Sequence, residues 1–152
     1  MDNNLQQEFW SWSLRRYEDE SLRNCLLSLQ ESCGLVAVEA LFFAWLAERG
    51  RELSRGEVLH MEAKIEPWLE NVLLPLRRRR VDWSDNPEHA QLRREALRIE
   101  IEAERSLAVL LCGSLEPSLI DAARVSYERN LSLITSLSSS DDLDRLIAAF
   151  GQ

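Results

Sequence analysis

The sequence predicts an all-α fold, a single compact bundle of six to eight helices, and three observations support this prediction. Apolar side chains recur at intervals of three and four residues through most of the 152 residues. Glycines, prolines and capping residues stand where these periodic segments begin or end. No segment of useful length shows the apolar–polar alternation of a half-buried strand.

The length and composition are those of one globular domain. A chain of 152 residues can bury roughly 68–70% of its unfolded surface, so it can form a core without disulfides or metals. The apolar fraction of 45% and the charged fraction of 29% are typical of a folded protein. We therefore expect one domain over residues 1–152, with a possible subdivision into halves 1–80 and 81–152.

Three helices are predicted in the N-terminal third. The first covers about residues 4–17, and the second ends at Gly34, where glycine suits the left-handed conformation that follows a helix. The third, over residues 35–49, is apolar on nearly all sides. A helix with this pattern usually lies at the centre of a bundle.

The middle of the chain contains one signal for the start of a helix and two prolines that disfavour its continuation. Ser54 and Glu57 have the spacing of a capping box, which predicts the start of a helix. Proline cannot donate a backbone hydrogen bond, so we expect a break or kink at Pro67 and a further segment, bent at Pro75, that reaches Arg80.

The longest helix is predicted between Pro87 and Cys112, since one apolar face recurs along it. That face consists of Leu92, Ala96, Ile99, Ala103, Leu107 and Leu110. A further helix is expected from Pro117 to about Leu137, followed by a last one over residues 141–150.

Charge and cysteine content limit the function classes. The formal net charge of −8 disfavours general binding to nucleic acids or anionic membranes, because such binding depends on clustered cations. The first residues lack the positive and apolar regions of a signal peptide, and the apolar run at 35–47 is too short to span a bilayer. Three cysteines without paired spacing favour reduced thiols, so we expect a cytoplasmic location and no membrane partner.

Several short motifs in series resemble those of a known protein family. They follow the pattern FW-x-x-SL, LQ, PW and PLR, at residues 9–14, 29–30, 67–68 and 75–77. Over about residues 8–80 the chain resembles a proteobacterial domain-of-unknown-function family of small helical proteins. The resemblance implies a bacterial cytoplasmic protein and no particular activity. Where that family tends to have Asp-Val-Asn, this chain has Val36-Ala37-Val38.

The motifs of enzyme chemistry are missing or incomplete. Glu57 and His60 have the spacing of two metal ligands, but the second such motif of a di-iron bundle is missing. No phosphate-binding glycine loop and no nucleophile elbow occurs. We therefore assign no catalytic residue, no metal ligand and no cofactor, and lean away from an enzyme.

Glu39 is the one charged residue within the apolar third helix. A buried charge requires a partner, and an arginine such as Arg23 is the favoured one. The alternative is a carboxylate that binds a small ligand or substrate in a pocket near Glu39 and His60.

Arginine and tryptophan residues supply the other candidate sites. The run from Arg77 through Arg78 and Arg79 to Arg80, followed by Trp83, either pairs with the acidic stretch 95–104 or forms a docking patch for acidic protein or nucleic-acid phosphate.

Trp10 and Trp12 point to different faces of the first helix, so one of them is expected at a groove or an interface between subunits. The favoured function is a non-catalytic interaction module that binds another protein or a second copy of itself. An exposed apolar patch around these tryptophans or on the face of residues 92–110 would serve this function. Ligand binding near Glu39 and nucleic-acid docking through the arginines are the alternatives.

Overall fold

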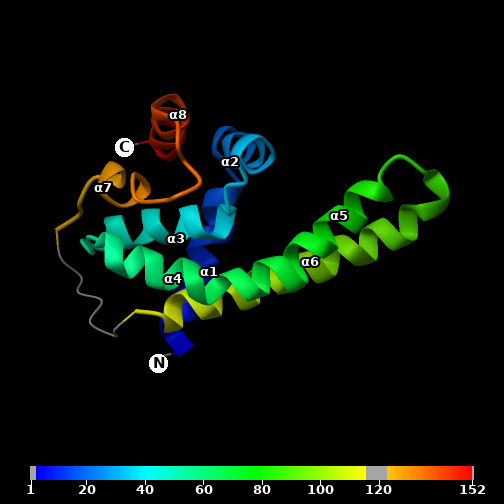
Figure 1. Cartoon of the computed structure of the whole chain (residues 1–152), viewed down its shortest axis with the longest axis horizontal. Coiled ribbons are helices and arrows are strands. Elements are labelled where there is room, and N and C mark those ends of the chain that lie inside the picture. Colours follow the sequence, from blue (N-terminus) through cyan, green and yellow to red (C-terminus); the bar gives the residue numbers. More distant parts are fainter. Residues whose placement is uncertain (1–2, 116–122, 152) are drawn as a thin grey trace.

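The computed structural model describes residues 3–115 and 123–151, and every regular element within them is helical (Figure 1). The predicted all-α bundle is therefore confirmed. The elements are α1 (Asn3–Tyr17), α2 (Glu20–Cys33), α3 (Ala37–Glu48), α4 (Arg55–Trp68), a π-helical turn η1 (Leu69–Leu73), α5 (Leu74–Asp82), a 3₁₀ turn η2 (Pro87–His89), α6 (Ala90–Gly113), α7 (Tyr127–Leu131) and α8 (Ser140–Phe150).

Helix α3 is the centre of the bundle, as its apolar sequence predicts. All ten residues from Val38 to Ala47 are buried, and α1, α2, α6 and α7 pack around them. Phe9 of α1 lies edge-on to Phe42, with ring centroids 5.1 Å apart, and 5.3 Å from Trp45. Within the described residues, no helix has the length and apolar character needed to cross a bilayer.

The predicted end of α2 and start of α4 are confirmed by their local geometry. Gly34 adopts φ 76°, a left-handed conformation that costs glycine little because it has no Cβ. The Ser54 hydroxyl accepts a hydrogen bond from the backbone N–H of Glu57 at 3.2 Å, and the Glu57 carboxylate accepts one from the N–H of Ser54 at 2.9 Å. This reciprocal capping box satisfies two backbone donors that the first turn leaves without helical partners.

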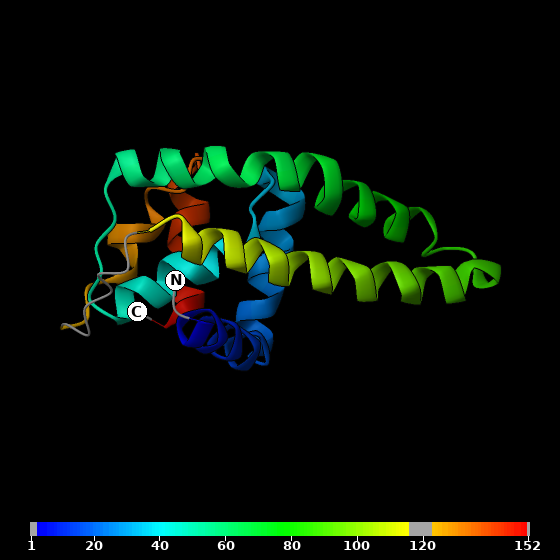
Figure 2. The ribbon, with the colours of Figure 1, turned by 90° about the horizontal axis from the view of Figure 1, so that it is seen from below.

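The expected break at Pro67 is not present, because α4 continues through Pro67 to Trp68. The irregularity lies instead in η1, where the Leu74 N–H donates to the Leu69 carbonyl, five residues earlier. Proline lacks an N–H, and its ring crowds the carbonyl four residues before it. A wider turn directly before Pro75 gives this ring space, so the rod from α4 into α5 stays continuous (Figure 2).

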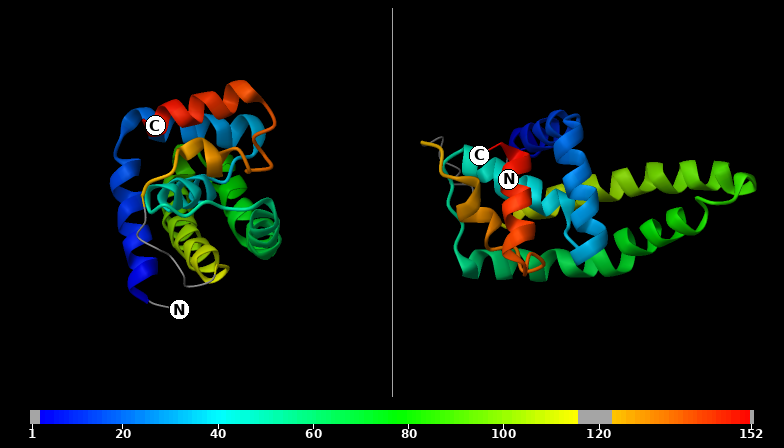
Figure 3. Two further views of the ribbon diagram at one scale, coloured as in Figure 1. Left: turned by 90° about the vertical axis from the view of Figure 1, so that its left-hand side faces the viewer. Right: turned by 90° about the horizontal axis from the view of Figure 1, so that it is seen from above.

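Helices α5 and α6 form an antiparallel pair that projects from the rest of the bundle, and we call residues 74–101 the helical arm (Figures 1 and 3). The predicted apolar face of α6 is only half correct. Its buried residues include Ala96, Glu100, Ala103, Leu107 and Leu111, whereas the predicted Leu92, Ile99 and Leu110 are exposed. The sequence offers two apolar stripes on α6, and packing against α5, α1, α3 and α4 buries the one that contains Glu100.

The long helix predicted over 117–137 is also corrected. Residues 116–122, including Pro117, lie outside the described residues, and α7 covers only Tyr127–Leu131. Ile134 is buried but lies in the turns between α7 and α8. The buried Asn130 binds backbone groups near the end of α3, which holds α7 across that helix and prevents a straight continuation.

Candidate functional site

The arginine run of α5 is divided between the interior and the surface. Arg77 Nε donates to Glu100 Oε1 at 3.1 Å, and Arg80 donates to both Glu100 oxygens at 2.5 and 3.3 Å. The Glu100 side chain is only 4% exposed, and its hydrogen bond raises the pKa of Arg80 above its ordinary value. Arg78 and Arg79 are exposed. Arg77 and Arg80 thus pair with Glu100 of the acidic stretch 95–104. Only Arg78 and Arg79 are left exposed for docking of a phosphate or an acidic protein.

Trp83 lies where α5 ends at the tip of the arm. The residue is half-buried, and its ring stands edge-on to His89 with centroids 6.5 Å apart. This contact ties the tip of α5 to the start of α6. Trp83 therefore has a structural role, in addition to the predicted role in the docking patch.

A groove lies where α1 meets α6, and we call it the α1–α6 groove. Its volume is about 370 Å³, within the roughly 300–1,000 Å³ of small-molecule pockets. Four exposed apolar side chains border it: Leu14, Leu27, Leu97 and Ile101. The remaining lining residues are Trp10, Ser13, Tyr17, Gln30, Ala37, Val38, Leu41, Arg80, Glu100 and Glu104.

Besides Arg80, two groups that line the groove have shifted pKa values. Burial, followed by the negative charge of Glu100, raises the pKa of Glu104 to about 7. Arg77 opposes this shift from 3.8 Å away. Burial is also the main reason why the pKa of Tyr17 is raised. The groove thus combines apolar walls with a small number of polar groups in a desolvated setting, the composition typical of binding sites.

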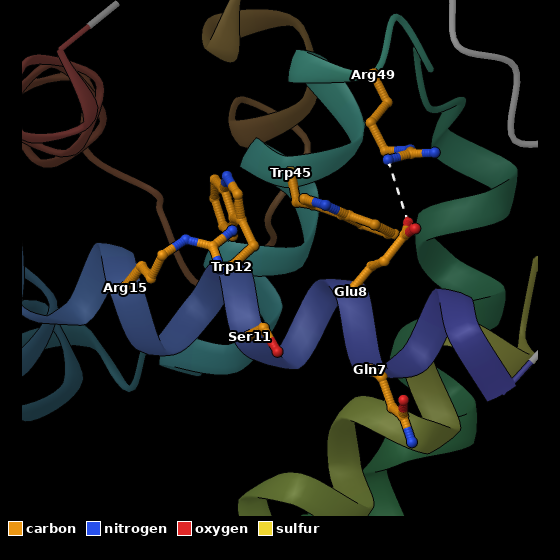
Figure 4. A pocket seen from close by; sticks show the side chains of 7 residues that line it. All are labelled: Gln7, Glu8, Ser11, Trp12, Arg15, Trp45 and Arg49. Atoms are coloured by element: carbon orange, nitrogen blue, oxygen red, sulfur yellow. Dashed lines mark hydrogen bonds and ion pairs between the residues drawn. The ribbon is translucent and has the colours of Figure 1, made fainter.

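The second hollow, around Trp12, is more open (Figure 4). Two of its polar side chains have partners: Trp12 Nε1 donates to Glu48 at 3.2 Å, and Arg49 pairs with Glu8 at 3.5 Å. In Figure 4 the Trp12 and Trp45 rings lie on one side of α1, while Ser11 points away from them. Trp10 and Trp12 therefore line different surfaces.

Comparison with known proteins gives one match. A family described as Protein of unknown function (DUF2390) matches residues 8–111. The chain belongs to this family. No curated protein and no solved structure matches it.

The family match extends further than the resemblance over residues 8–80 implies. It includes the helical arm and nearly all of α6, so the family has in common the elements that build the groove. The tripeptide Val36-Ala37-Val38 lies at the start of α3, and two of its residues line the groove. Substitutions at Ala37 or Val38 would therefore change the groove itself.

Glu39 has a different partner from the expected Arg23. Arg23 donates to the backbone carbonyls of Tyr17 and Glu18, whereas Glu39, only 2% exposed, forms a hydrogen bond with Glu62. Burial and the charge of Glu62 raise the pKa of Glu39 far above its usual range.

The hypothesis of a pocket shared by Glu39 and His60 gains no support, because His60 is exposed on α4. In the ranges 3–115 and 123–151, no three histidine, cysteine, aspartate or glutamate side chains gather closely enough to hold a metal ion.

Replacing Glu39 with glutamine should change how stability depends on pH. Below the ordinary pKa of about 4.3, Glu39 is protonated in both the folded and the unfolded chain. As the pH rises, the unfolded chain loses this proton first, so the folded state of the wild type loses stability. Glutamine has no proton to lose. The stability of Glu39→Gln relative to wild type should therefore increase between pH 5 and pH 8, measured by urea unfolding.

Glu66→Gln is the matched control, because Glu66 is exposed on the same α4 that carries Glu62. Its difference from wild type should change much less over the same pH range. A constant difference for Glu39→Gln would contradict the assignment of a protonated Glu39.

Sequence reasoning singled out Trp10 and Arg80 but missed Ser13 and Tyr17 of the groove, although a signal for them exists. Trp10, Ser13, Leu14 and Tyr17 follow the i, i+3, i+4, i+7 spacing of one helical face. Glu100 falls on the stripe of Ala96, Ala103 and Leu107, but an acid on an apolar stripe gives no indication that two arginines of another helix neutralise it.

Proposed function

We propose that the chain is a non-catalytic interaction module, and that one side of α6 binds a partner protein. The proposal is supported by Leu92, Ile99 and Leu110, which are 46%, 43% and 36% exposed. Their spacings of 7 and 11 residues put them on the same side of a helix with 3.6 residues per turn. We call these three residues the outer stripe.

Most of the exposed large apolar side chains lie on α5 and α6, the two helices that extend into the arm. Of the ten exposed large apolar side chains in the described residues, seven lie on α5 and α6. Scattered exposed leucines are ordinary, but a concentrated apolar surface on a projecting element is typical of interaction sites. Covering each half-exposed leucine or isoleucine of the outer stripe should contribute roughly 1 kcal/mol.

Charged residues flank the outer stripe in the way that a polar rim surrounds an interface. Glu95 and Glu102 are exposed, and Arg98 pairs with Glu95 at 3.1 Å while remaining 67% exposed. Such exposed pairs contribute little to stability. They remain available to orient a partner of complementary charge.

The test compares Ile99→Glu with Ile101→Glu. Both isoleucines lie on α6 and are similarly exposed, at 43% and 46%, but they differ by about 200° around the helix. A photo-crosslinking residue at position 99 should capture the partner, which is then purified and titrated. We expect Ile99→Glu to weaken this complex at least tenfold and Ile101→Glu to leave it unchanged.

Sedimentation of the chain at increasing concentration decides whether the partner is a second copy. Equal effects of the two variants on the complex, or none from Ile99→Glu, would refute the proposal.

We also propose that residues 1–152 form one domain in the bacterial cytoplasm. Helices from both halves support this, because α6 packs on α1, α3 and α4, and α8 packs on α2. Cys25, Cys33 and Cys112 are free, and burial raises the pKa of Cys112 to about 12, which keeps it an unreactive thiol. One cooperative unfolding transition is the expected result, and two transitions would indicate separate halves.

A further inference from the structure

The α1–α6 groove contains the start of a helix that has no side-chain cap. Helix α3 begins at Ala37, and Val36 at the N-cap position cannot accept a hydrogen bond through its side chain. Ala37 and Val38 of this first turn line the groove, and Val38 is only 5% exposed. The first N–H groups of a helix have no partner within it, and together they carry a partial positive charge. A hydrogen-bond acceptor in the groove would satisfy them.

A second helix supplies an independent polar group to the same groove. The Ser13 side chain of α1 lines the groove and is only 4% exposed, and its hydroxyl has no hydrogen-bond partner among the described residues. Buried hydroxyl groups are nearly always hydrogen-bonded, because an unsatisfied one has lost its water without replacement. Ser13 therefore points to a bound group that the folded chain does not itself provide.

The charges around the groove are compatible with an anion. Arg80 lines it, and Glu100 is neutralised by Arg77 and Arg80. Glu104 has its pKa raised to about 7, so part of its negative charge is absent at neutral pH. The acid of the first turn of α3, Glu39, faces Glu62 rather than the groove and is kept protonated, so it does not compensate the helix terminus.

We propose that the groove binds an aliphatic monocarboxylic acid. The carboxylate accepts hydrogen bonds from the first turn of α3 and from the Ser13 hydroxyl. The apolar chain lies between Leu14, Leu97 and Ile101, which border the groove. This site does not depend on the proposed function, because the groove and the outer stripe lie on different sides of α6.

The experiment titrates the full chain with octanoate, 1-octanol and octylammonium at pH 7, and follows the binding by calorimetry and by tryptophan fluorescence, since Trp10 lines the groove. Octanoate should bind at least tenfold more tightly than the other two. Hexanoate should bind about fifteenfold more weakly than octanoate, because each buried methylene group is worth about 0.8 kcal/mol.

Two variants remove the polar partners of the carboxylate, and Ser13→Ala does so without removing a hydrogen bond of the folded chain. Ser13→Ala deletes a hydroxyl that has no partner and should weaken octanoate binding at least tenfold without loss of stability. Val36→Asp places a carboxylate at the N-cap of α3, where it satisfies the same N–H groups. This variant should bind octanoate at least tenfold more weakly.

Ile101→Glu should abolish octanoate binding, whereas Ile99→Glu should preserve it, the reverse of their effects on the partner protein. If 1-octanol bound as tightly as octanoate, the groove would bind apolar chains without recognising a carboxylate, and the proposal would be wrong. Tighter binding of octylammonium would assign the head group to Glu104 instead. Absence of octanoate binding at millimolar concentration, or unchanged binding by both Ser13→Ala and Val36→Asp, would also overturn the proposal.

Discussion

Replacing Asn130 with alanine should lower the free energy of unfolding by about 3 kcal/mol. The Asn130 side chain is fully buried and makes three hydrogen bonds to the backbone. Its Oδ1 accepts from Leu53 N–H at 2.8 Å, and its Nδ2 donates to the carbonyls of Phe43 and Arg51 at 3.0 and 2.9 Å. Alanine removes all three bonds and leaves the Leu53 donor buried without a partner. Urea unfolding followed by circular dichroism measures the loss.

Two further substitutions separate the hydrogen bonds from other effects. Asn130→Asp keeps the acceptor for Leu53 but loses both donors and adds a buried charge, so it should be at least as destabilising as alanine. Asn71→Ala changes an exposed asparagine in η1 and should alter the free energy of unfolding by less than about 0.5 kcal/mol. If Asn130→Ala resembled Asn71→Ala, Asn130 would not be what holds α7 against α3.

Replacing Glu100 with glutamine should lower the free energy of unfolding by about 2 kcal/mol. Removing one member of a buried ion pair leaves the other charge uncompensated, a loss of about 3–5 kcal/mol for a fully buried pair. The Arg77 and Arg80 side chains are 17% and 22% exposed, so they regain some hydration and the loss is smaller. The same urea unfolding experiment applies.

Glu95→Gln is the matched control, since it removes a glutamate of the same helix from an exposed pair with Arg98. The expected change is below about 1 kcal/mol and disappears at 1 M salt, because exposed charges are screened. The effect of Glu100→Gln should persist at that salt concentration. If salt removed both effects equally, the arginines would not be held in a desolvated cluster.

The elements that sequence predicted correctly are those that local interactions determine. The capping box at Ser54, the left-handed Gly34 and the apolar α3 all depend on residues within one turn or one helix. The wrong predictions involve positions where distant segments compete. The helix α4 passes through Pro67, and the irregularity lies in η1 before Pro75. The helix expected to reach Leu137 ends at Leu131, where α7 is held by Asn130.

The candidate sites show the same division. The run of four arginines is evident in the sequence, but only the fold shows that its members differ. Arg77 and Arg80 bind Glu100, whereas Arg78 and Arg79 are exposed. Glu39 is buried, as its place in the apolar helix indicates, yet its partner is Glu62 rather than an arginine. Side-chain pairing between helices depends on their crossing and register, which periodicity within one helix does not contain.

By itself, the sequence determined that this chain is helical, where most of its helices begin, and that α3 is central, because spacing and capping are local properties. The tertiary structure decided which of two apolar stripes on α6 is buried and which is exposed. It also decided that Ser13 and the uncapped start of α3 line one groove. Both outcomes follow from how α1, α3, α5 and α6 pack together, since packing between helices fixes which side chains lose their water.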